Sequence, residues 1–405
     1  MKDKKFAEWT EIVGASETLK TAAKVASLKS EGKHIINFGA GEPDFNTPPK
    51  IIEAAYKAIV EGKVRYTSER GIEPLRKVAA QKMKSLYGIS YDPFKETVIT
   101  AGAKQAIFAA LCSLLTPKDE VIILAPYWVS YPAMVQIAGG IPVIVHTRLE
   151  DSFLPYLPRL KQAITPRTKA LILNTPNNPT GMVYPEKLVR EISSLAVERD
   201  FYLISDEVYD RLILDEKEKH FSPAMVGEEV RKRSLIAFSC SKTYAMTGWR
   251  VGYAFGPEPL ITNIAKYIGQ STSCVNAAAQ YAALYALSSP DSEQAAEEMR
   301  KKFIQRKNKT VSLLKEIPKT RFIEPTATFF VLLSVKSYLG LSSPKGTPIK
   351  DDSSFCEALL DEECVATVSG TAFGAEGCIR ISFATSDEEI SEGCARIKRF
   401  VLSLK

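Results

Sequence analysis

The sequence predicts an α/β protein that has a large, mostly parallel sheet sandwiched by helices and a smaller α+β domain. Two observations predict this class. Between residues 97 and 255, short apolar runs alternate with amphipathic helical patterns, as expected for strands buried on both faces of a parallel sheet. After residue 289 this alternation ends, and a long charged helical pattern is followed by short strands mixed with helices.

Seven segments are predicted to form the strands of the large sheet, because each is short and mostly apolar. Helical patterns fall between several of them, for example at Gln105–Leu115 and Pro185–Glu198. Strands that alternate with helices in this way are typical of a parallel sheet. The seven segments are Thr97–Thr100, Val121–Leu124, Pro142–Val145, Ala170–Leu173, Tyr202–Ser205, Leu235–Phe238 and Val251–Phe255.

The C-terminal third has a different pattern. Ser289–Leu314 predicts a long charged helix, and the segment Ser342–Asp352, rich in Pro, Gly and Ser, predicts a surface loop. The other predicted elements are strands at Phe329–Ser334 and Cys378–Ala384 and helices at Ser353–Leu360 and Ile390–Leu404. We therefore expect a large domain over residues 48–298, a small domain over residues 299–405, and an N-terminal segment, residues 1–47, that packs with the small domain.

The composition is ordinary for a globular enzyme. The chain has 405 residues, of which 45% are hydrophobic and 25% are charged. Its 53 Lys and Arg residues are interspersed with 47 Asp and Glu residues, so the net charge of +6 forms no basic stripe along the sequence. We therefore expect no nucleic-acid partner.

Cysteine and histidine usage and the apolar runs exclude several other classes. The seven cysteines are scattered without a CxxC pair, which favours free thiols in a reducing cytoplasm. His34, His146 and His220 lack the spacing of a metal site or a Ser-His-Asp triad. The N-terminus lacks the apolar core of a signal peptide, and no run approaches the ~18–20 apolar residues of a spanning helix. We expect neither a metal nor a membrane partner.

Lys242 lies in the stretch SCSKTYAMTGWRVGY, directly after a predicted buried strand. A lysine that is desolvated at a strand end and lies near another cation has a lowered pKa and can act as an amine nucleophile. Ser239, Ser241 and Arg250 supply the hydroxyl donors and the cationic fork that a phosphate dianion needs. Together these residues predict pyridoxal phosphate (PLP) held by Lys242 as a Schiff base. The alternative is a surface lysine beside a structural arginine.

Further candidates follow other predicted strands, because ligands of open parallel sheets bind at the carboxyl ends of the strands. Gly102 and Ala103 open a helix whose free N–H groups can bind phosphate, although any tight strand-to-helix turn has this pattern. Asn178 lies in NTPNNPTG, where its amide either contacts a ligand oxygen or belongs to a structural turn.

Two charged residues next to or within apolar strands need partners. Asp206 begins the sequence DEVY directly after a strand. The protonated pyridine nitrogen of PLP would give its carboxylate a cationic partner, and Tyr209 would then hydrogen-bond the phenolic oxygen of the ring. The alternative for Asp206 is the N-cap of a following helix. Arg380 lies within the apolar sequence GCIRISF, which predicts either a bidentate clamp for a substrate α-carboxylate or a structural salt bridge.

Nearly the whole chain resembles the class I/II aminotransferases, in the fold-type I group of PLP enzymes. The motifs that carry the resemblance occur in the family's order: FGAGEPDFNTP at Phe38–Pro48, VRYTSERGIEPLR, AGAKQA, APYWVSYP, NTPNNPTG, SDEVY, SCSKTYAMTGWRVGY and GCIRISFA. The resemblance implies a PLP-binding large domain, a ping-pong transamination and a homodimer with active sites at the interface.

The resemblance also implies roles for the matching residues. Lys242 would bind the cofactor and then shuttle a proton, and Asp206 would bind the pyridine nitrogen. The other cofactor contacts would be Tyr209 and Asn178 at the ring hydroxyl, Trp128 on the ring, Ser239, Ser241, Arg250, Gly102 and Ala103 at the phosphate, and Tyr66 at the phosphate from the other subunit. The substrate contacts would be Arg380, Asn178 and the backbone of Gly41 at the α-carboxylate, together with Trp128 and Lys104.

Lys104 indicates an acidic substrate, because in one aspartate aminotransferase subgroup a lysine in the same GxKQA context contacts the distal carboxylate. A solvated lysine is the alternative, which the helix dipole disfavours in a first turn. The chain departs from the family at Ser369-Gly370, where Pro-Gly is frequent, and at residues 327–330, where ATFF replaces GAFY. These departures concern substrate specificity and domain closure.

The expected reaction is transamination between L-aspartate or L-glutamate and a 2-oxo acid such as 2-oxoglutarate or oxaloacetate. An aromatic amino acid or prephenate aminotransferase, or a PLP-dependent β-lyase, is the alternative on the same fold, since PLP permits several outcomes. A non-catalytic regulator is disfavoured, because only 37 residues precede the FGAGEPDF motif, which is too few for an added nucleic-acid-binding domain.

Overall fold

The computed structural model describes residues 6–7 and 9–405 of the chain. A seven-stranded sheet with the order β2-β8-β7-β6-β5-β3-β4 forms its larger part. All neighbours pair in parallel except β8, which is antiparallel to β2 and β7. The strands are β2 (Thr97–Thr100), β3 (Glu120–Ala125), β4 (Ile141–His146), β5 (Thr168–Asn174), β6 (Tyr202–Asp206), β7 (Ser234–Ser239) and β8 (Gly252–Phe255). The predicted fold class is confirmed, and each predicted strand of the sheet is present.

Helices cover both faces of this sheet, because successive residues of a buried strand point to opposite sides. In β3, Val121 and Ile123 pack with apolar residues of α5 and α11, whereas Ile122 and Leu124 pack with those of α8. The helices of this part are α3 (Pro49–Val60), α4 (Glu73–Tyr87), α5 (Ala103–Leu114), α6 (Ser130–Ile137), α7 (Leu157–Ala163), α8 (Glu186–Glu198), α9 (Glu228–Arg231), α10 (Cys240–Thr243), α11 (Glu258–Ser271) and α12 (Ala277–Ser288).

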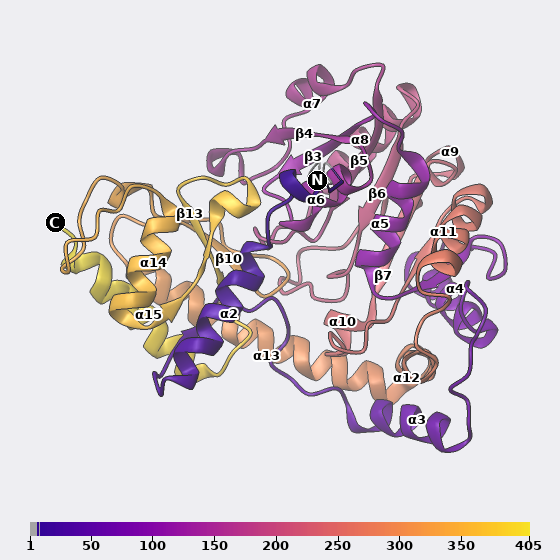
Figure 1. The fold of residues 1–405 in the computed structure, drawn as a ribbon, viewed down its shortest axis with the longest axis horizontal. Helices are drawn as coiled ribbons and strands as arrows, with labels where there is room; N and C mark the ends of the chain where they lie inside the picture. The colour runs from indigo at the N-terminus through magenta and orange to yellow at the C-terminus, as the bar shows by residue number, and fades with distance from the viewer. Residues whose placement is uncertain (1–5, 8) are drawn as a thin grey trace, which may run out of the picture.

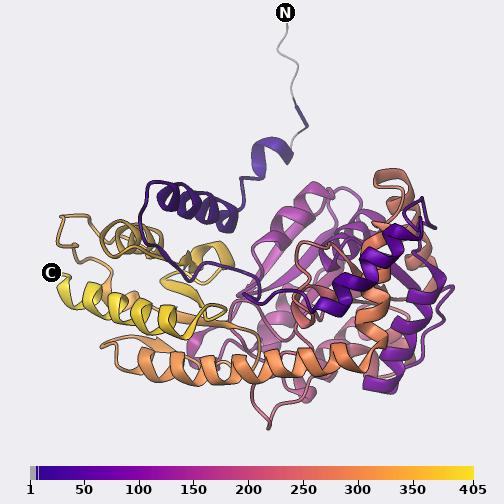
Figure 2. The same ribbon diagram turned by 90° about the horizontal axis from the view of Figure 1, so that it is seen from below.

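The C-terminal part is built on a second, four-stranded antiparallel sheet with the order β12-β13-β10-β9. Its strands are β9 (Arg321–Phe322), β10 (Phe330–Ser334), β12 (Val368–Ser369) and β13 (Cys378–Ser382), and its helices are α14 (Asp352–Glu363) and α15 (Asp387–Ser403). The long helix α13 (Pro290–Lys315) runs along both parts of the molecule (Figures 1 and 2). The domain boundaries at residues 47 and 298 remain a proposal, and the second falls inside α13.

The N-terminal segment crosses the molecule. α1 (Trp9–Ile12) approaches α6 of the larger part. α2 (Glu17–Ser30) buries Val25 and Leu28 against Leu360 and Ala366 of the C-terminal part. The short strand β1 (Ile36–Asn37) pairs in parallel with β11 (Val365–Ala366). Residues 9–40 therefore reach both parts of the molecule and lie close to the space between them.

The prediction of a surface loop at Ser342–Asp352 is correct for its middle and wrong for its end. Residues 344–348 are exposed, but Asp352 is only 1% exposed and begins α14. Its carboxylate accepts hydrogen bonds from a distant turn, which composition alone does not indicate.

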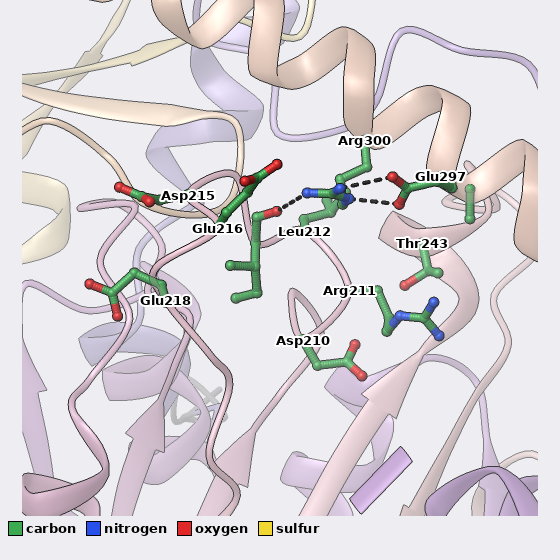
Figure 3. A pocket seen from close by; sticks show the side chains of 11 residues that line it. Asp210, Arg211, Leu212, Asp215, Glu216, Glu218, Thr243, Glu297 and Arg300 are labelled. Carbon is green, nitrogen blue, oxygen red and sulfur yellow. Dashed lines mark hydrogen bonds and ion pairs between the residues drawn. The ribbon is translucent and has the colours of Figure 1, made fainter. Parts of the chain in front are cut away.

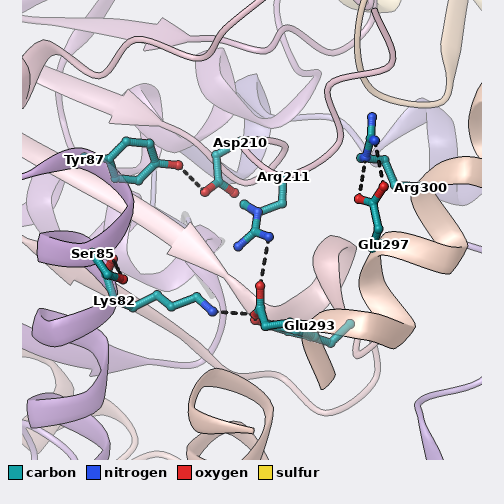
Figure 4. A network of polar contacts seen from close by, with 9 residues as sticks. Lys82, Ser85, Tyr87, Asp210, Arg211, Glu293, Glu297 and Arg300 are labelled. Carbon is teal, nitrogen blue, oxygen red and sulfur yellow. Dashed lines mark hydrogen bonds and ion pairs between the residues drawn. The ribbon is translucent and has the colours of Figure 1, made fainter. Parts of the chain in front are cut away.

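Glu293 anchors α13 to the larger part. Its carboxylate accepts a hydrogen bond from Tyr244 Oη at 2.6 Å. It also accepts one from Arg211 Nη2 at 2.8 Å and pairs with Lys82 of α4 (Figure 4). Because Tyr244 directly follows α10, its contact with Glu293 fixes that short helix. Arg300, one turn further along α13 than Glu297, pairs with Glu297 and donates to the carbonyl of Ile213 at 2.9 Å.

A pocket of about 340 Å³ lies beside these ion pairs (Figure 3). It is lined by Thr243 of α10, by Glu297 and Arg300 of α13, and by the acidic segment 210–218. Among the described residues, no helix is both long and apolar enough to cross a membrane. In the same part of the chain, no group of three or more His, Cys, Asp or Glu side chains is arranged to hold a metal.

Gly393 of α15 provides a test of how the N-terminal segment packs. A Cβ atom at this position would lie 2.3 Å from Cζ of the buried Phe38. We expect Gly393→Ala to destabilise the protein by about 1–3 kcal/mol, because overpacking outweighs the gain in helix propensity of about 1 kcal/mol. Thermal unfolding followed by circular dichroism measures the change.

Gly269→Ala in α11 is the matched control. A Cβ at Gly269 would meet only the side chain of Glu69, whose Cβ lies at 3.7 Å and Cγ at 4.0 Å, both ordinary contact distances. This variant should melt at or above the wild-type temperature. Equal melting temperatures for Gly393→Ala and the wild type would contradict the packing described here.

Candidate active site

A cleft of about 610 Å³ opens at the carboxyl edge of the large sheet and brings together thirteen of the fourteen predicted site residues. They are Gly41, Gly102, Ala103, Lys104, Trp128, Asn178, Asp206, Tyr209, Ser239, Ser241, Lys242, Arg250 and Arg380. The fourteenth, Tyr66, lies outside the lining of this cleft, and its side chain is 88% exposed.

Lys242 lies on α10, which begins immediately after β7. Its Nζ donates a hydrogen bond to the carbonyl oxygen of Gly41 at 2.6 Å. Burial lowers the pKa of Lys242 to about 8, the carboxylate of Glu42 opposes this change, and the positive charges of Arg380 and Arg250 add to it. At this pKa about a tenth of the amine is neutral at pH 7 and about half at pH 8, far more than for a solvated surface lysine.

Asp206 ends β6 and is 4% exposed. Its Oδ2 accepts a hydrogen bond from Tyr131 Oη at 2.6 Å. No ion pair reaches it from a described residue. Burial raises the pKa of Asp206 to about 6, because desolvation penalises the charged form. The N-cap alternative does not hold, since β6 is followed by a turn rather than a helix.

A concave group of donors surrounds the N-terminus of α5. No side chain caps this helix, and its first residue Ala103 follows Gly102, which has φ +77°. A Cβ at Gly102 would lie 2.7 Å from Nη2 of Arg250. The hydroxyls of Ser239 and Ser241 are 2.8 Å apart and line the same cleft. Hydroxyl groups, a guanidinium and free backbone N–H groups together match the needs of a phosphate dianion.

Arg380 lies on β13 and is only 1% exposed. Its Nη1 donates to Oδ1 of Asn178 at 3.1 Å and its Nη2 to the carbonyl of Gly39 at 2.9 Å, while its buried Nε has no partner. Burial lowers the pKa of Arg380 to about 10. No described carboxylate pairs with it, so the structural salt bridge considered above is absent. A buried guanidinium without a counter-ion is suited to an anionic ligand.

Lys104 and Trp128 lie together in the cleft. Lys104 Nζ is 4.7 Å from the centre of a Trp128 ring. Burial, followed by the positive charge of Arg250, lowers the pKa of Lys104. The first turn of a helix is also an unfavourable place for a cation because of the helix dipole. An anion bound here would offset both effects.

Several lining residues were not among the predicted site residues. Tyr131 lies in the APYWVSYP motif, but only its contact with Asp206 reveals a role. Asn174, a polar residue at the end of an apolar strand, donates to the carbonyl of Asp206 at 3.0 Å and accepts from the N–H of Asn178 at 3.0 Å. Thr18, Leu19, Thr21 and Ala22 of α2 also line the cleft, and no local sequence pattern marks them.

Comparison with known proteins identifies the family. The sequence profile of the family described as aminotransferase class I and II matches residues 33–397. The chain is 40% identical over 384 residues to an aspartate/prephenate aminotransferase of Thermus thermophilus, with 95% of each chain covered. It is 39% identical over 397 residues to an aspartate aminotransferase of Bacillus subtilis, with 98% of this chain and 99% of the relative covered.

Solved structures agree with these sequence relationships. The aspartate aminotransferase from Thermus thermophilus with maleate superimposes with a TM-score of 0.92 at 39% identity, over 98% of this chain and 100% of the other. The aspartate aminotransferase from Rhizobium meliloti superimposes with a TM-score of 0.94 at 36% identity, over 99% of this chain and 100% of the other. The protein therefore belongs to the class I and II aminotransferases.

Proposed function

We propose that this aminotransferase uses PLP to transfer the amino group of L-aspartate or L-glutamate to a 2-oxo acid such as 2-oxoglutarate or oxaloacetate. The observation that carries the proposal is one cleft in which an amine of lowered pKa, Lys242, lies with the buried, unpaired charges of Asp206 and Arg380. The relatives named aspartate aminotransferase support the choice of substrate.

The residues of the cleft fit PLP. The donors around Gly102, together with Ser239, Ser241 and Arg250, would hold its phosphate. Asp206 would hold the pyridine nitrogen as an ion pair, with Tyr209 and Asn178 at the ring hydroxyl and Trp128 against the ring. When bound, PLP supplies an electron sink that stabilises negative charge at the substrate Cα.

Lys242 would act as nucleophile and then as general base. A neutral amine is needed for both roles, and with a pKa of about 8 roughly a tenth of Lys242 is neutral at pH 7, rising to about half at pH 8. The Gly41 carbonyl, 2.6 Å from Nζ, holds the amine within the cleft. Asp206 keeps its negative charge above a pH of about 6, so it can partner a protonated pyridine in the same pH range.

The two ends of a dicarboxylic substrate would be bound by different cations. Arg380, supported by Asn178 and by the backbone around Gly41, would bind the α-carboxylate. Lys104 would bind the distal carboxylate, which relieves its unfavourable position at the start of α5. This division gives acidic amino acids an advantage over apolar ones.

Prephenate as amino acceptor is the second candidate. Relatives from Thermus thermophilus and Cereibacter sphaeroides are named aspartate/prephenate aminotransferase, and the second is 41% identical over 393 residues. Prephenate also has two carboxylates, so the same pair of cations can bind it. This function would add to aspartate transamination rather than replace it.

We also propose a homodimer with shared active sites in a reducing cytoplasm. Among the described residues, ten of the sixteen exposed large hydrophobic side chains lie between Phe6 and Tyr66, including Tyr56 and Val60 on the outer side of α3. An apolar surface of this kind is typical of a protein interface. All seven cysteines are free thiols, which supports a reducing compartment.

The pH dependence of cofactor attachment tests the state of Lys242. The lowered pKa means that the neutral amine predominates above pH 8. We expect the rate of PLP attachment to the apoenzyme to rise about tenfold from pH 7 to pH 9 and then to level off. With a lysine of ordinary pKa, the rate would keep rising past pH 10. Stopped-flow absorbance gives the rate, and Lys242→Ala, which should show no covalent attachment, is the control. A rate that still climbs steeply above pH 9 would contradict the lowered pKa.

Subunit complementation tests the shared site. We expect Lys242→Ala and Tyr66→Ala each to be strongly impaired as pure proteins. After the two are unfolded together and refolded, half of the dimers pair one variant with the other, and one of their two sites has both Lys242 and a partner's Tyr66. About a quarter of wild-type activity should therefore return. Recovery of no activity, with dimers present by size-exclusion chromatography, would argue against a Tyr66 contribution across the interface.

A further inference from the structure

Asp352 is a buried carboxylate that accepts four hydrogen bonds and has no cationic partner among the described residues. Its Oδ2 accepts from Ser369 Oγ at 2.5 Å and from the N–H of Thr371 at 2.8 Å. Its Oδ1 accepts from Thr371 Oγ1 at 2.9 Å and from the N–H of Gly377 at 2.9 Å. No ion pair joins it to a Lys, Arg or His side chain in the described part of the chain. A buried charge that is held only by hydrogen bonds has a strict geometric requirement.

These bonds close the turn between β12 and β13. Ser369 and Thr371 lie at its beginning, and Gly377 lies at its end, one residue before β13. Only the small domain contributes to this arrangement, but the turn also contacts the larger part. The carbonyl of Phe373 accepts from the N–H of Tyr127 at 3.0 Å, and Tyr127 directly precedes Trp128 of the cleft.

The same turn sets the environment of Arg380. The ring centre of Phe373 is 4.8 Å from Cζ of Arg380, and Phe330 lies 4.3 Å away as a second aromatic contact. Val368, on β12 just before the turn, pairs with Arg380 across the sheet. A change in the path of the turn therefore moves both a ring that contacts the guanidinium and the strand next to it.

We propose that Asp352 is a positioning residue for substrate carboxylate binding, which it controls by fixing the turn that carries Phe373 against Arg380. The inference rests on the proposed role of Arg380 as the α-carboxylate clamp. Asp352 lies outside the cleft lining and contacts no substrate, so it acts only through the turn. The same proposal explains why Ser369 stands where the family frequently has proline, since a proline has no hydroxyl to donate to Asp352.

The test measures binding of maleate, an unreactive dicarboxylate, to the PLP-loaded enzyme by titration calorimetry. Asp352→Asn keeps the size of the side chain but leaves donors of the turn facing an amide N–H₂ group. We expect the Kd of maleate to rise about tenfold, and the KM for aspartate to rise similarly with kcat changed less than about twofold. Ser369→Ala removes one of the four bonds, is a milder change for folding, and should raise the Kd about threefold.

Asp351→Ala is the matched control, because Asp351 caps the same helix through the N–H of Ser354 at 2.8 Å but has no bond to the turn. It should lower the melting temperature and leave the Kd of maleate unchanged. If Asp351→Ala and Asp352→Asn raised the Kd of maleate equally, Asp352 would act only by stabilising the helix, and the proposal would be overturned. Unchanged maleate binding in Asp352→Asn and Ser369→Ala would overturn it as well.

A double-mutant cycle identifies the residue through which Asp352 acts. The effect of Asp352→Asn should nearly disappear in an Arg380→Lys background and persist in a Lys104→Ala background. Full persistence in the Arg380→Lys background would overturn the proposed route. If Arg380→Lys alone left maleate binding unchanged, Arg380 would not be the carboxylate clamp, and both the clamp and the role of Asp352 would be wrong. If Arg380→Lys weakened maleate binding but Asp352→Asn did not, only the proposed role of Asp352 would be overturned.

Discussion

Two buried charged side chains, Asp206 and Arg380, meet the half-buried amine of Lys242 in one cleft, and none of the three forms an ion pair with a described residue. Taking an ion out of water costs several kcal/mol unless it is paired or hydrogen-bonded. Each of the three has hydrogen-bond partners that hold it in place but do not neutralise it. Accordingly, the pKa values of Lys242 and Arg380 are lowered and the pKa of Asp206 is raised. PLP and a dicarboxylic substrate would supply the missing charges.

The fold brings these groups together by two means. Parallel strands end at the same edge of the sheet, where Asn174 is paired in register with Asp206. Arg380 instead comes from the second sheet, and α13 joins the two parts. Through Glu293, α13 also holds Tyr244 and thus the short helix that carries Lys242. The distances at the site therefore depend on contacts that lie outside it.

The sequence is sufficient to predict the large sheet and most of the cleft, for a physical reason. Strands buried on both faces are apolar throughout, so a polar residue at their end, such as Asp206, stands out. The contribution of α2 could not be predicted, because Thr18 and Thr21 reach the cleft only through tertiary packing. The burial of Asp352 was also missed, since its partners lie 17 to 25 residues further along the chain. Tyr66, expected to act across a subunit interface, is exposed in the single chain.

The most direct test of the central claim is a single half-reaction. The PLP-loaded enzyme is mixed separately with aspartate, glutamate, alanine and phenylalanine, without any 2-oxo acid, and the absorbance of the cofactor is followed by stopped flow. Our account predicts fast conversion by aspartate and glutamate only, and loss of most of this advantage in Lys104→Ala with little change for phenylalanine. Faster conversion by phenylalanine or alanine, or an equal effect of Lys104→Ala on all four amino acids, would contradict the assignment of an acidic substrate. The absence of a cofactor chromophore after addition of PLP would contradict the account as a whole.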